Sequence, residues 1–186
     1  MALILASQSP RRKELLGYIT ENFTVRVSEA EETTDPALSP EETVKALAVL
    51  KGEVVSTAYP DDVIISADTI VVLDDKILGK PHSRDEAFRM LSSLSGRSHT
   101  VFTGVCVICG DKKLCFAERT EVIFCDLSEE DINAYIETGE PFDKAGGYGI
   151  QGRGSVMISS ITGDYYNVMG LPVARLNRLL KDNSLI

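Results

Sequence analysis

The sequence predicts an α/β fold of the mixed α+β kind, built around a mixed sheet in a single domain that spans residues 1–186. Segments rich in valine, isoleucine and phenylalanine alternate with segments that begin like helices. Hairpin-like turns interrupt this alternation, so both parallel and antiparallel strand pairs are expected. The length suits one domain, and no internal repeat, low-complexity tract or long linker divides it.

The predicted helices are recognised by their first residues. Serine stands at four expected N-caps, where its hydroxyl can accept from a backbone N–H: Ser9, Ser39, Ser83 and Ser128. An acidic residue follows each of the last three serines three positions later, as in a capping box. The expected helices cover residues 10–17, 40–56, 84–94, 129–138 and a C-terminal segment that begins at Leu171-Pro172.

The predicted strands lie between these helices. They cover residues 1–6, 23–27, 63–67, 70–73, 99–108, 114–124 and 156–161. Gly110-Asp111-Lys112 is typical of a hairpin turn between two long strands, and Asp74-Asp75 is typical of another. In this arrangement Asp68 lies at the C-terminal end of a buried strand.

Charge and hydropathy exclude some classes of partner. With 28 acidic and 19 basic residues, the formal net charge is −9. Such a chain is a poor general binder of nucleic acid or of anionic membranes, because both rely on many lysine and arginine contacts. No apolar run reaches the length of a membrane span, and residues 1–6 are too short for a signal segment.

The cysteines favour a cytoplasmic location. Four of them cluster in an apolar region: Cys106, Cys109, Cys115 and Cys125. The Cys106-Val-Ile-Cys109 spacing falls in an expected strand, where the two thiols point to opposite faces. Buried structural cysteines are therefore favoured over a metal or redox site, and reduced thiols fit a cytoplasmic protein.

Ser7-Gln8-Ser9-Pro10-Arg11-Arg12 joins the first expected strand to the first expected helix. Free N–H groups at a helix start attract an anion, and arginine suits phosphate oxygens. A plain capped helix with two solvated arginines is the alternative. Sequence chemistry alone divides these two interpretations evenly.

Two further segments offer a carboxylate and a cation. Asp68, at a strand end, can hold a metal ion or take a proton from water; a capping or turn aspartate is the alternative. Gly79-Lys80-Pro81 is not a P-loop, since no earlier glycine stands at the required place and proline replaces Ser/Thr. Lys80 is a candidate phosphate contact or a solvated turn lysine.

A glycine-rich segment, residues 143–152, implies unusual backbone angles or close approach to a ligand. A flexible surface loop is disfavoured because Tyr148, Ile150 and the following Val156-Met157-Ile158 are expected to be packed. The Gln151 amide carries a donor and an acceptor, which suits a base edge with adjacent carbonyl and N–H groups. Glu29, Glu31 and Glu32 form an acidic cluster that is either a set of metal ligands or a solvated charge run.

Together these segments resemble the Maf family, the septum-formation-inhibitor-like nucleoside triphosphate pyrophosphatases. The order and spacing of the matching segments carry the resemblance over almost the whole chain: Ser7-Gln8-Ser9-Pro10-Arg11-Arg12, Ser66-Ala67-Asp68-Thr69, Gly79-Lys80-Pro81, Leu94-Ser95-Gly96-Arg97-Ser98-His99, Ala145-Gly146-Gly147-Tyr148-Gly149-Ile150-Gln151-Gly152 and Gly163-Asp164-Tyr165-Tyr166-Asn167-Val168-Met169-Gly170-Leu171-Pro172.

The resemblance implies two lobes around a central cleft, similar to the inosine triphosphate pyrophosphatases. It also implies hydrolysis of a nucleoside triphosphate to a monophosphate and pyrophosphate with a divalent cation, Mg²⁺ or Mn²⁺. Asp68 matches the catalytic aspartate and, with Glu32, the acidic metal-binding residues; Glu31 is the alternative to Glu32. Phosphate-binding positions are matched by Ser7, Arg11, Arg12, Lys51 and Lys80. Positions associated with substrate preference are matched by Arg11, Thr69 and Gln151.

The Tyr148-Gly149-Ile150-Gln151 sequence resembles the branch that acts on dTTP and UTP rather than the sister branch that acts on 7-methyl-GTP. One departure is Gly52, which follows Lys51 where the family commonly has alanine. Since glycine weakens a helix by about 1 kcal/mol, we expect fraying there. A nucleotide-binding regulator of cell division with little turnover is a second hypothesis, and a phosphatase that releases inorganic phosphate is a third. A homodimer is implied by the resemblance alone.

Overall fold

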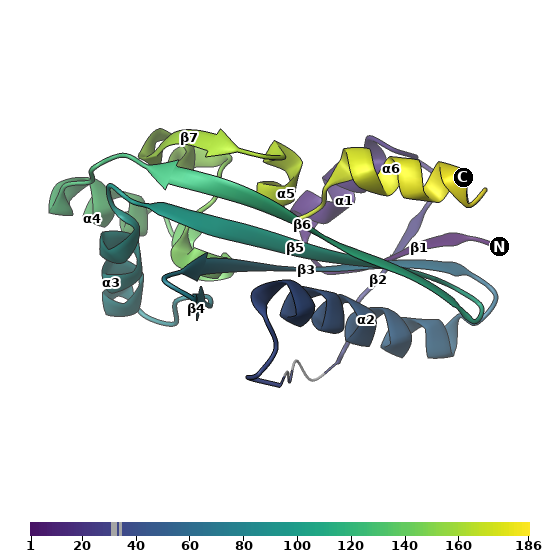
Figure 1. Cartoon of the computed structure of the whole chain (residues 1–186). Coiled ribbons are helices and arrows are strands. Elements are labelled where there is room, and N and C mark those ends of the chain that lie inside the picture. Colours follow the sequence, from purple (N-terminus) through teal and green to yellow (C-terminus); the bar gives the residue numbers. More distant parts are fainter. Residues whose placement is uncertain (31–32, 34) are drawn as a thin grey trace. The chain divides into compact units, whose positions relative to one another are not determined.

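The computed structural model describes residues 1–30, 33 and 35–186. It confirms the mixed α/β class, because the described strands form one sheet that contains both parallel and antiparallel pairs (Figure 1). The strand order is β2-β1-β3-β5-β6-β7, with β4 paired to β3. β1 (Leu3–Ala6) is parallel to β2 (Thr24–Arg26) and to β3 (Val63–Leu73), whereas β4 (Lys76–Leu78) is antiparallel to β3.

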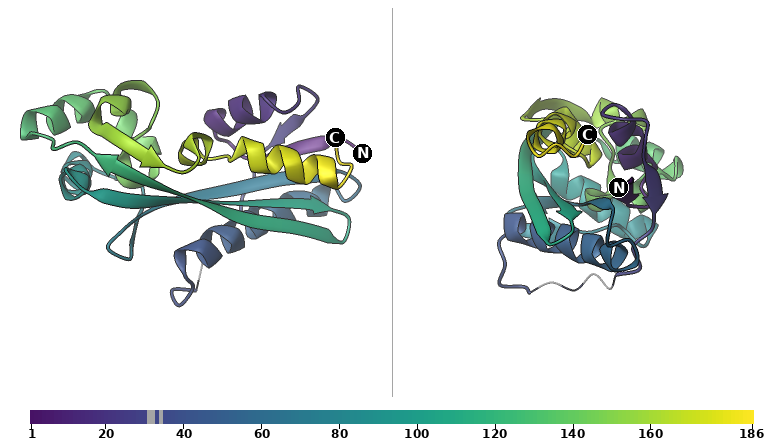
Figure 2. Two further views of the ribbon diagram at one scale, coloured as in Figure 1. Left: turned by 45° about the horizontal axis from the view of Figure 1, so that its top comes forward. Right: turned by 90° about the vertical axis from the view of Figure 1, so that its right-hand side faces the viewer.

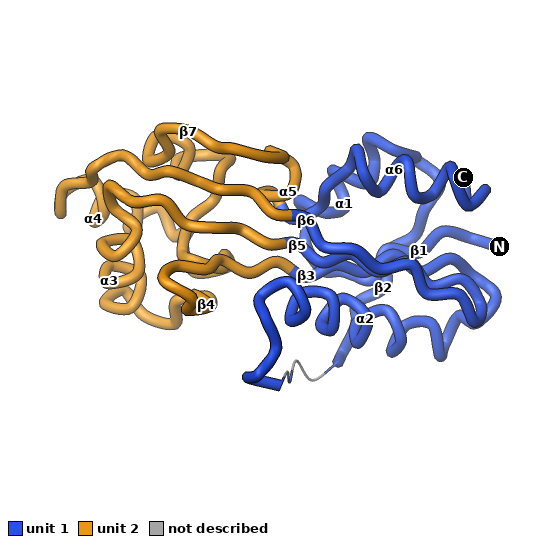
Figure 3. Tube along the Cα trace, viewed as in Figure 1, with its two compact units in different colours: residues 1–68, 103–118, 170–186 blue, residues 69–102, 119–169 orange. Residues whose placement is uncertain are grey.

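The chain forms two compact units (Figure 3). Unit 1 comprises Met1–Asp68, Thr103–Glu118 and Gly170–Ile186, and unit 2 comprises Thr69–Phe102 and Arg119–Met169. The strands β3, β5 (Ser98–Cys109) and β6 (Lys112–Phe124) contribute residues to both units. The assignment of residues 1–186 to a single domain stays a prediction.

Unit 1 is a layered structure. Helix α2 (Pro40–Ala58) covers one face of its strands, and α1 (Pro10–Gly17) and α6 (Val173–Asp182) lie on the other (Figures 1 and 2). Because side chains alternate along a strand, Ile4 and Ala6 of β1 point toward α2. There they join a core of buried residues from α2, β3 and β5: Ala48, Val55, Ile64, Cys106 and Ile108.

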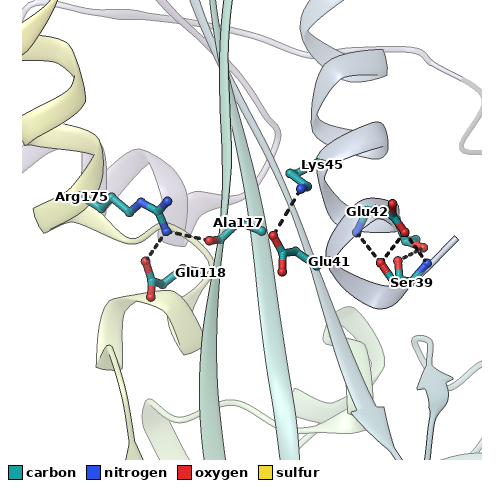
Figure 4. Close-up of polar contacts among 8 residues, drawn as sticks. Ser39, Glu41, Glu42, Lys45, Ala117, Glu118 and Arg175 are labelled. Atoms are coloured by element: carbon teal, nitrogen blue, oxygen red, sulfur yellow. Dashed lines mark hydrogen bonds and ion pairs between the residues drawn. The ribbon is translucent and has the colours of Figure 1, made fainter.

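Capping chemistry starts α2 and α4 (Glu129–Glu137) as predicted. The Ser39 hydroxyl accepts from the Glu42 N–H, and the Glu42 carboxylate accepts from the Ser39 N–H in return (Figure 4). The box predicted at Ser83 is only half formed. The backbone of Ser83 is extended, and the Glu86 carboxylate accepts from the N–H of His82 at 2.8 Å instead of from the N–H of Ser83.

Helix α6 is tied to β6 by one arginine side chain. The Arg175 guanidinium donates to the carbonyl of Ala117 at 2.8 Å and to the carboxylate of Glu118 at 3.0 Å (Figure 4). The same guanidinium lies 4.4 Å from the centre of the Phe116 ring, a cation–π distance. These contacts fix one turn of α6 against a long strand.

Helix α2 lies unusually close to the sheet, because small residues face each other across the contact. A Cβ added to Gly104 of β5 would lie 2.2 Å from the carbonyl oxygen of Val44, so only glycine fits. Ser66 of β3 donates its hydroxyl to the carbonyl of Ala48 at 2.6 Å. The predicted fraying at Gly52 is wrong: α2 continues to Ala58, because the glycine lies buried against Ser66.

Unit 2 packs helices α3 (Arg84–Leu94) and α4 against its part of the sheet, together with short helical turns and strand β7 (Ile158–Thr162). The shorter elements are η1 (Glu140–Asp143), η2 (Ala145–Gly147), η3 (Gly152–Met157) and α5 (Tyr165–Met169). Its buried core includes Leu91, Val101, Phe124, Ile136 and Tyr148. The glycine-rich segment therefore belongs to a packed unit.

Two details of the predicted strands are wrong. β3 runs unbroken from Val63 to Leu73, so Asp68 lies in the middle of a strand rather than at its end. The last predicted strand begins at Ile158 and not at residue 156, because the chain first forms the η3 turn. Val156 lies in that turn and is 81% exposed, whereas Met157 is buried as expected.

No helix in the described part of the chain combines the length and the apolar character that crossing a bilayer requires. The longest, α2, has 19 residues, and it carries several charged side chains. Its apolar positions are used inside unit 1, where Val44, Leu47 and Ala48 are buried.

Candidate active site

The centre of the candidate site in unit 1 is an ion pair between Asp68 and Lys51. Asp68 is only 8% exposed. The Lys51 ammonium donates to its Oδ1 atom at 2.5 Å. A carboxylate inside a strand of valines and isoleucines is costly unless a cation compensates it. The pair therefore explains how β3 continues through Asp68.

Helix α2 sets the position of Lys51. The close contact of α2 with the sheet brings the next residue, Gly52, against Ser66, which lies two positions before Asp68 on the same face of β3. Lys51 then needs only to extend along the strand to reach the carboxylate. Its side chain is 15% exposed, so most of its stem is covered. The sequence predicted both residues but not their contact.

The junction between β1 and α1 is a network of hydroxyls and guanidinium groups. Ser7 is buried, and its Oγ atom accepts from the Ser9 N–H at 3.2 Å. The Ser9 Oγ atom accepts from the Arg12 N–H at 3.4 Å, which confirms the predicted helix cap. The Arg12 Nη1 group approaches the Ser7 Oγ atom at 3.5 Å. Arg11 is half-buried in the same turn.

Arg12 also has a structural contact that the sequence did not reveal. Its Nε–H donates to the carbonyl of Gly170 at 2.8 Å, which ties the helix start to the segment that precedes α6. Gly170 has φ +112°, a conformation that favours glycine. A guanidinium has several donors in a fixed fork, so one side chain can bind more than one acceptor.

The predicted acidic residues are candidate ligands for a metal ion. Glu32 and its alternative Glu31 lie outside the described residues, so their role stays a prediction. In the part of the chain that the structure describes, no three His, Cys, Asp or Glu side chains are grouped as metal ligands. Asp68, a buried carboxylate, fits a hard cation that is also held by substrate oxygens, as Mg²⁺ commonly is.

Unit 2 carries the other predicted residues. Thr69 is the next residue of β3 after Asp68, so its side chain points to the opposite face of the strand. Lys80 is exposed. The residue before it, Gly79, accepts the Gly146 N–H at its carbonyl at 2.9 Å. The structure thus brings the Gly79-Lys80-Pro81 segment directly against the glycine-rich segment.

The glycine loop, defined as residues 145–152, is packed and not a flexible surface segment. Gly146, Gly147 and Gly152 have φ near +70°. A Cβ on Gly146 would lie 2.9–3.0 Å from the side chain of Val71, so both angle and space require glycine there. The Gly149 N–H donates to the Tyr135 hydroxyl at 3.2 Å. Gln151, half-buried, stands at the N-cap of η3 but makes no capping hydrogen bond.

The structure adds His99 and Tyr148, a buried pair that the sequence analysis did not join. Their Nε2 and hydroxyl oxygen atoms lie 2.6 Å apart, and the two rings pack edge to face with Phe124. Burial lowers the pKa of His99 to about 4 and raises the pKa of the Tyr148 hydroxyl. The strand alternation that buries Val101 also buries His99, so a signal for its burial was present.

The Maf-like protein family matches residues 2–183 of this chain. A Bacillus velezensis protein named dTTP/UTP pyrophosphatase is 53% identical over 180 residues, which cover 97% of this chain and 95% of that protein. A Bacillus cereus protein of the same name is 52% identical over 179 residues, with coverage of 96% and 94%. Among solved structures, the Staphylococcus aureus Ham1 protein has a TM-score of 0.58 at 14% identity, covering 97% of this chain and 98% of that one, and so shares the fold. By motif order, family match and full-length similarity, the chain belongs to the Maf-like family.

Proposed function

We propose that this chain is a nucleoside triphosphate pyrophosphatase that hydrolyses dTTP and UTP to the nucleoside monophosphate and pyrophosphate. The observation that carries the proposal is the buried Lys51–Asp68 pair beside the arginine-rich turn of α1, in a chain similar over its whole length to proteins named dTTP/UTP pyrophosphatase. An acidic chain with net charge −9 needs such a local group of cations to hold a triphosphate.

The reaction requires a water molecule to attack the α-phosphorus while pyrophosphate departs. Asp68 is the acceptor-only group in unit 1 that can orient this water and take its proton. Lys51 keeps the carboxylate in place through their ion pair and contributes positive charge next to the reacting phosphate. The carboxylate is thus held in place before substrate arrives.

The guanidinium groups of Arg11 and Arg12 and the hydroxyl of Ser7 bind phosphate oxygens in this proposal. The N–H groups at the start of α1 add to them, since a helix N-terminus favours an anion. Lys80, an exposed lysine, is a further phosphate-binding position by family resemblance. A divalent cation, Mg²⁺ or Mn²⁺, held by Asp68, by Glu32 and by substrate oxygens, would neutralise part of the triphosphate charge.

The glycine loop of unit 2 supplies one residue for base selection. The Gln151 amide offers one donor and one acceptor, which complement a carbonyl and the N3–H of uracil or thymine. Thr69 and Arg11 are the other positions proposed to affect substrate preference. A cytoplasmic location and a homodimer complete the proposal, and size-exclusion chromatography with light scattering checks the second.

One assay tests the reaction. The protein is incubated with UTP, dTTP, CTP, GTP and 7-methyl-GTP in the presence of Mg²⁺ or Mn²⁺, and pyrophosphate and phosphate are measured separately. We expect pyrophosphate, fastest from UTP and dTTP, and none without the cation. Asp68→Asn is the matched control for a contaminating activity. Phosphate as the first product would make the protein a phosphatase, nucleotide binding without product would make it a regulator, and a preference for 7-methyl-GTP would place it in the sister branch.

A further inference from the structure

We propose that the hydrogen bond between His99 and Tyr148 positions the glycine loop so that the Gln151 amide reaches the pyrimidine base. The two residues then act as positioning residues for substrate selection, a role that rests on the proposed function and refines it. His99 lies on β5, and Tyr148 lies in the loop three residues before Gln151.

The loop holds its shape through contacts with other elements rather than through its own regular structure. The Gly146 N–H donates to the Gly79 carbonyl, and the Gly149 N–H donates to the Tyr135 hydroxyl. Beyond the loop, the Arg153 N–H donates to the Glu140 carboxylate at 3.2 Å. These bonds hold the backbone on both sides of Gln151. One of them, at Gly149, lies within the segment between Gly147 and Gln151 and is a single backbone contact.

The Tyr148 side chain adds a second constraint on this segment. It is 5% exposed, and His99 is 3% exposed. Their rings are 5.2 Å apart and nearly perpendicular, and each also packs against Phe124. Tyr148 is thus bonded to His99, a side chain on the long strand β5, and the strand is a rigid support for this contact. A shift of the loop would break a short, buried hydrogen bond and disturb both aromatic contacts of Tyr148.

The chemistry of His99 argues against a purely space-filling role. Its Nδ1 atom is buried and has no hydrogen-bond partner among the described residues. A buried polar atom without a partner destabilises the fold, so packing alone would favour an apolar side chain at this position. Unlike an apolar side chain, His99 makes one directional hydrogen bond to the Tyr148 hydroxyl. That bond specifies one loop position, as buried polar contacts do in other packed cores.

The experiment is a double-mutant cycle between Tyr148 and Gln151, with pyrophosphate release as the readout. Selectivity is defined as kcat/KM for UTP divided by kcat/KM for GTP. We expect Tyr148→Phe to lower selectivity about tenfold, mainly through a higher KM for UTP, because the removed hydroxyl acts on base binding and not on the chemical step. In the Gln151→Ala background the same change is expected to leave selectivity within about twofold, since the group that it positions is gone.

Two further variants complete the design. His99→Gln retains a hydrogen-bonding group toward the Tyr148 hydroxyl and is expected to keep more selectivity than His99→Leu, which retains none. Tyr165→Phe removes the same hydroxyl from a tyrosine that is 40% exposed in the same unit, and is expected to change nothing. Thermal unfolding of each variant confirms that it is folded at the assay temperature.

The outcomes separate the proposal from the function on which it rests. If the wild-type protein releases no pyrophosphate or does not prefer UTP over GTP, the proposed function fails before any variant is compared. If the preference is present but Tyr148→Phe leaves selectivity unchanged, the positioning role is wrong. It is also wrong if the variant lowers selectivity equally with and without Gln151.

Discussion

A buried polar pair lies at the candidate site of each unit, and the two pairs differ in charge. In unit 1, Lys51 and Asp68 form an ion pair with an Nζ–Oδ1 distance of 2.5 Å. In unit 2, His99 and Tyr148 share a hydrogen bond of 2.6 Å, and both are neutral near pH 7. Their neutrality follows from burial, which lowers the pKa of His99 to about 4 and raises the pKa of Tyr148.

This difference indicates a division of work. An ionised pair can exchange its partner for a phosphate, a cation or a proton, so it suits a step in which charge moves. A neutral buried pair makes no such exchange near pH 7, so its role is to orient the segment that carries it. We therefore propose that Lys51 and Asp68 act in the chemical step and that His99 and Tyr148 act, through the glycine loop, in the choice of base.

The largest expected effect tests the charged pair. Asp68→Asn removes the base but keeps the size of the side chain next to Lys51, so kcat should fall about 10²–10⁴-fold for every nucleotide alike. Steady-state pyrophosphate release from UTP, dTTP, CTP and GTP measures it. Activity close to that of the wild type would show that Asp68 does not act in the chemical step. A loss confined to nucleotides with one base would show that Asp68 also affects base selection.

The second effect concerns stability. Lys51→Met leaves the Asp68 carboxylate buried without its cation, and we expect a loss of about 3 kcal/mol in the free energy of unfolding. In the double variant with Asp68→Asn the loss should be clearly smaller, because no charge is left uncompensated. Urea denaturation of the four proteins measures this coupling. Strictly additive losses would mean that the two side chains do not depend on each other.

The third prediction uses pH to test the neutral pair. Above about pH 6.5 an imidazole is neutral in both the folded and the unfolded chain. As the pH falls below that value, the unfolded chain takes up a proton and the folded chain does not until about pH 4, so His99 lowers stability progressively over this range. Between pH 7 and pH 5 the wild-type protein should lose about 2 kcal/mol more than His99→Gln, which cannot titrate. Parallel pH profiles in urea denaturation would argue against a buried neutral histidine.

The smallest effect tests base selection. Gln151→Glu removes the amide donor, so one base carbonyl loses its partner, and kcat/KM for UTP and dTTP should fall about tenfold relative to GTP. The pyrophosphate product should be unchanged. A side-by-side kcat/KM series on UTP, dTTP, CTP and GTP measures the ratio. A uniform loss across all four would show that Gln151 supports the loop rather than contacting the base.

The sequence predicted well what local chemistry determines. The serine caps of α1 and α2, the hairpin at Gly110 and the fold class were all readable, because capping residues and strand propensity act within a few residues. The individual site residues were named from motifs. Their contacts were not, because Lys51 and Asp68, like His99 and Tyr148, are far apart in sequence and meet only through the packing of helices and strands.

The errors have the same origin. Asp68 was placed at a strand end because an aspartate commonly breaks a buried strand, and only the ion pair with Lys51 lets β3 continue. Val156 was expected to be buried from its hydropathy alone, yet the η3 turn, which begins at Gly152 with φ +68°, exposes it. Side chains whose environment is set by distant partners are therefore the ones that local patterns miss.

The close contact of α2 with the sheet determines what an added methyl group would meet at position 52. A methyl group at Gly52 would lie 2.7 Å from the Ser66 Oγ atom, so alanine would displace the hydroxyl that now donates to Ala48. Alanine would also strengthen the helix by about 1 kcal/mol, roughly what one hydrogen bond contributes. Alanine at position 52 would thus gain helix stability and weaken a buried hydrogen bond, and its methyl group would also lie 3.0 Å from the Cδ1 atom of Ile108.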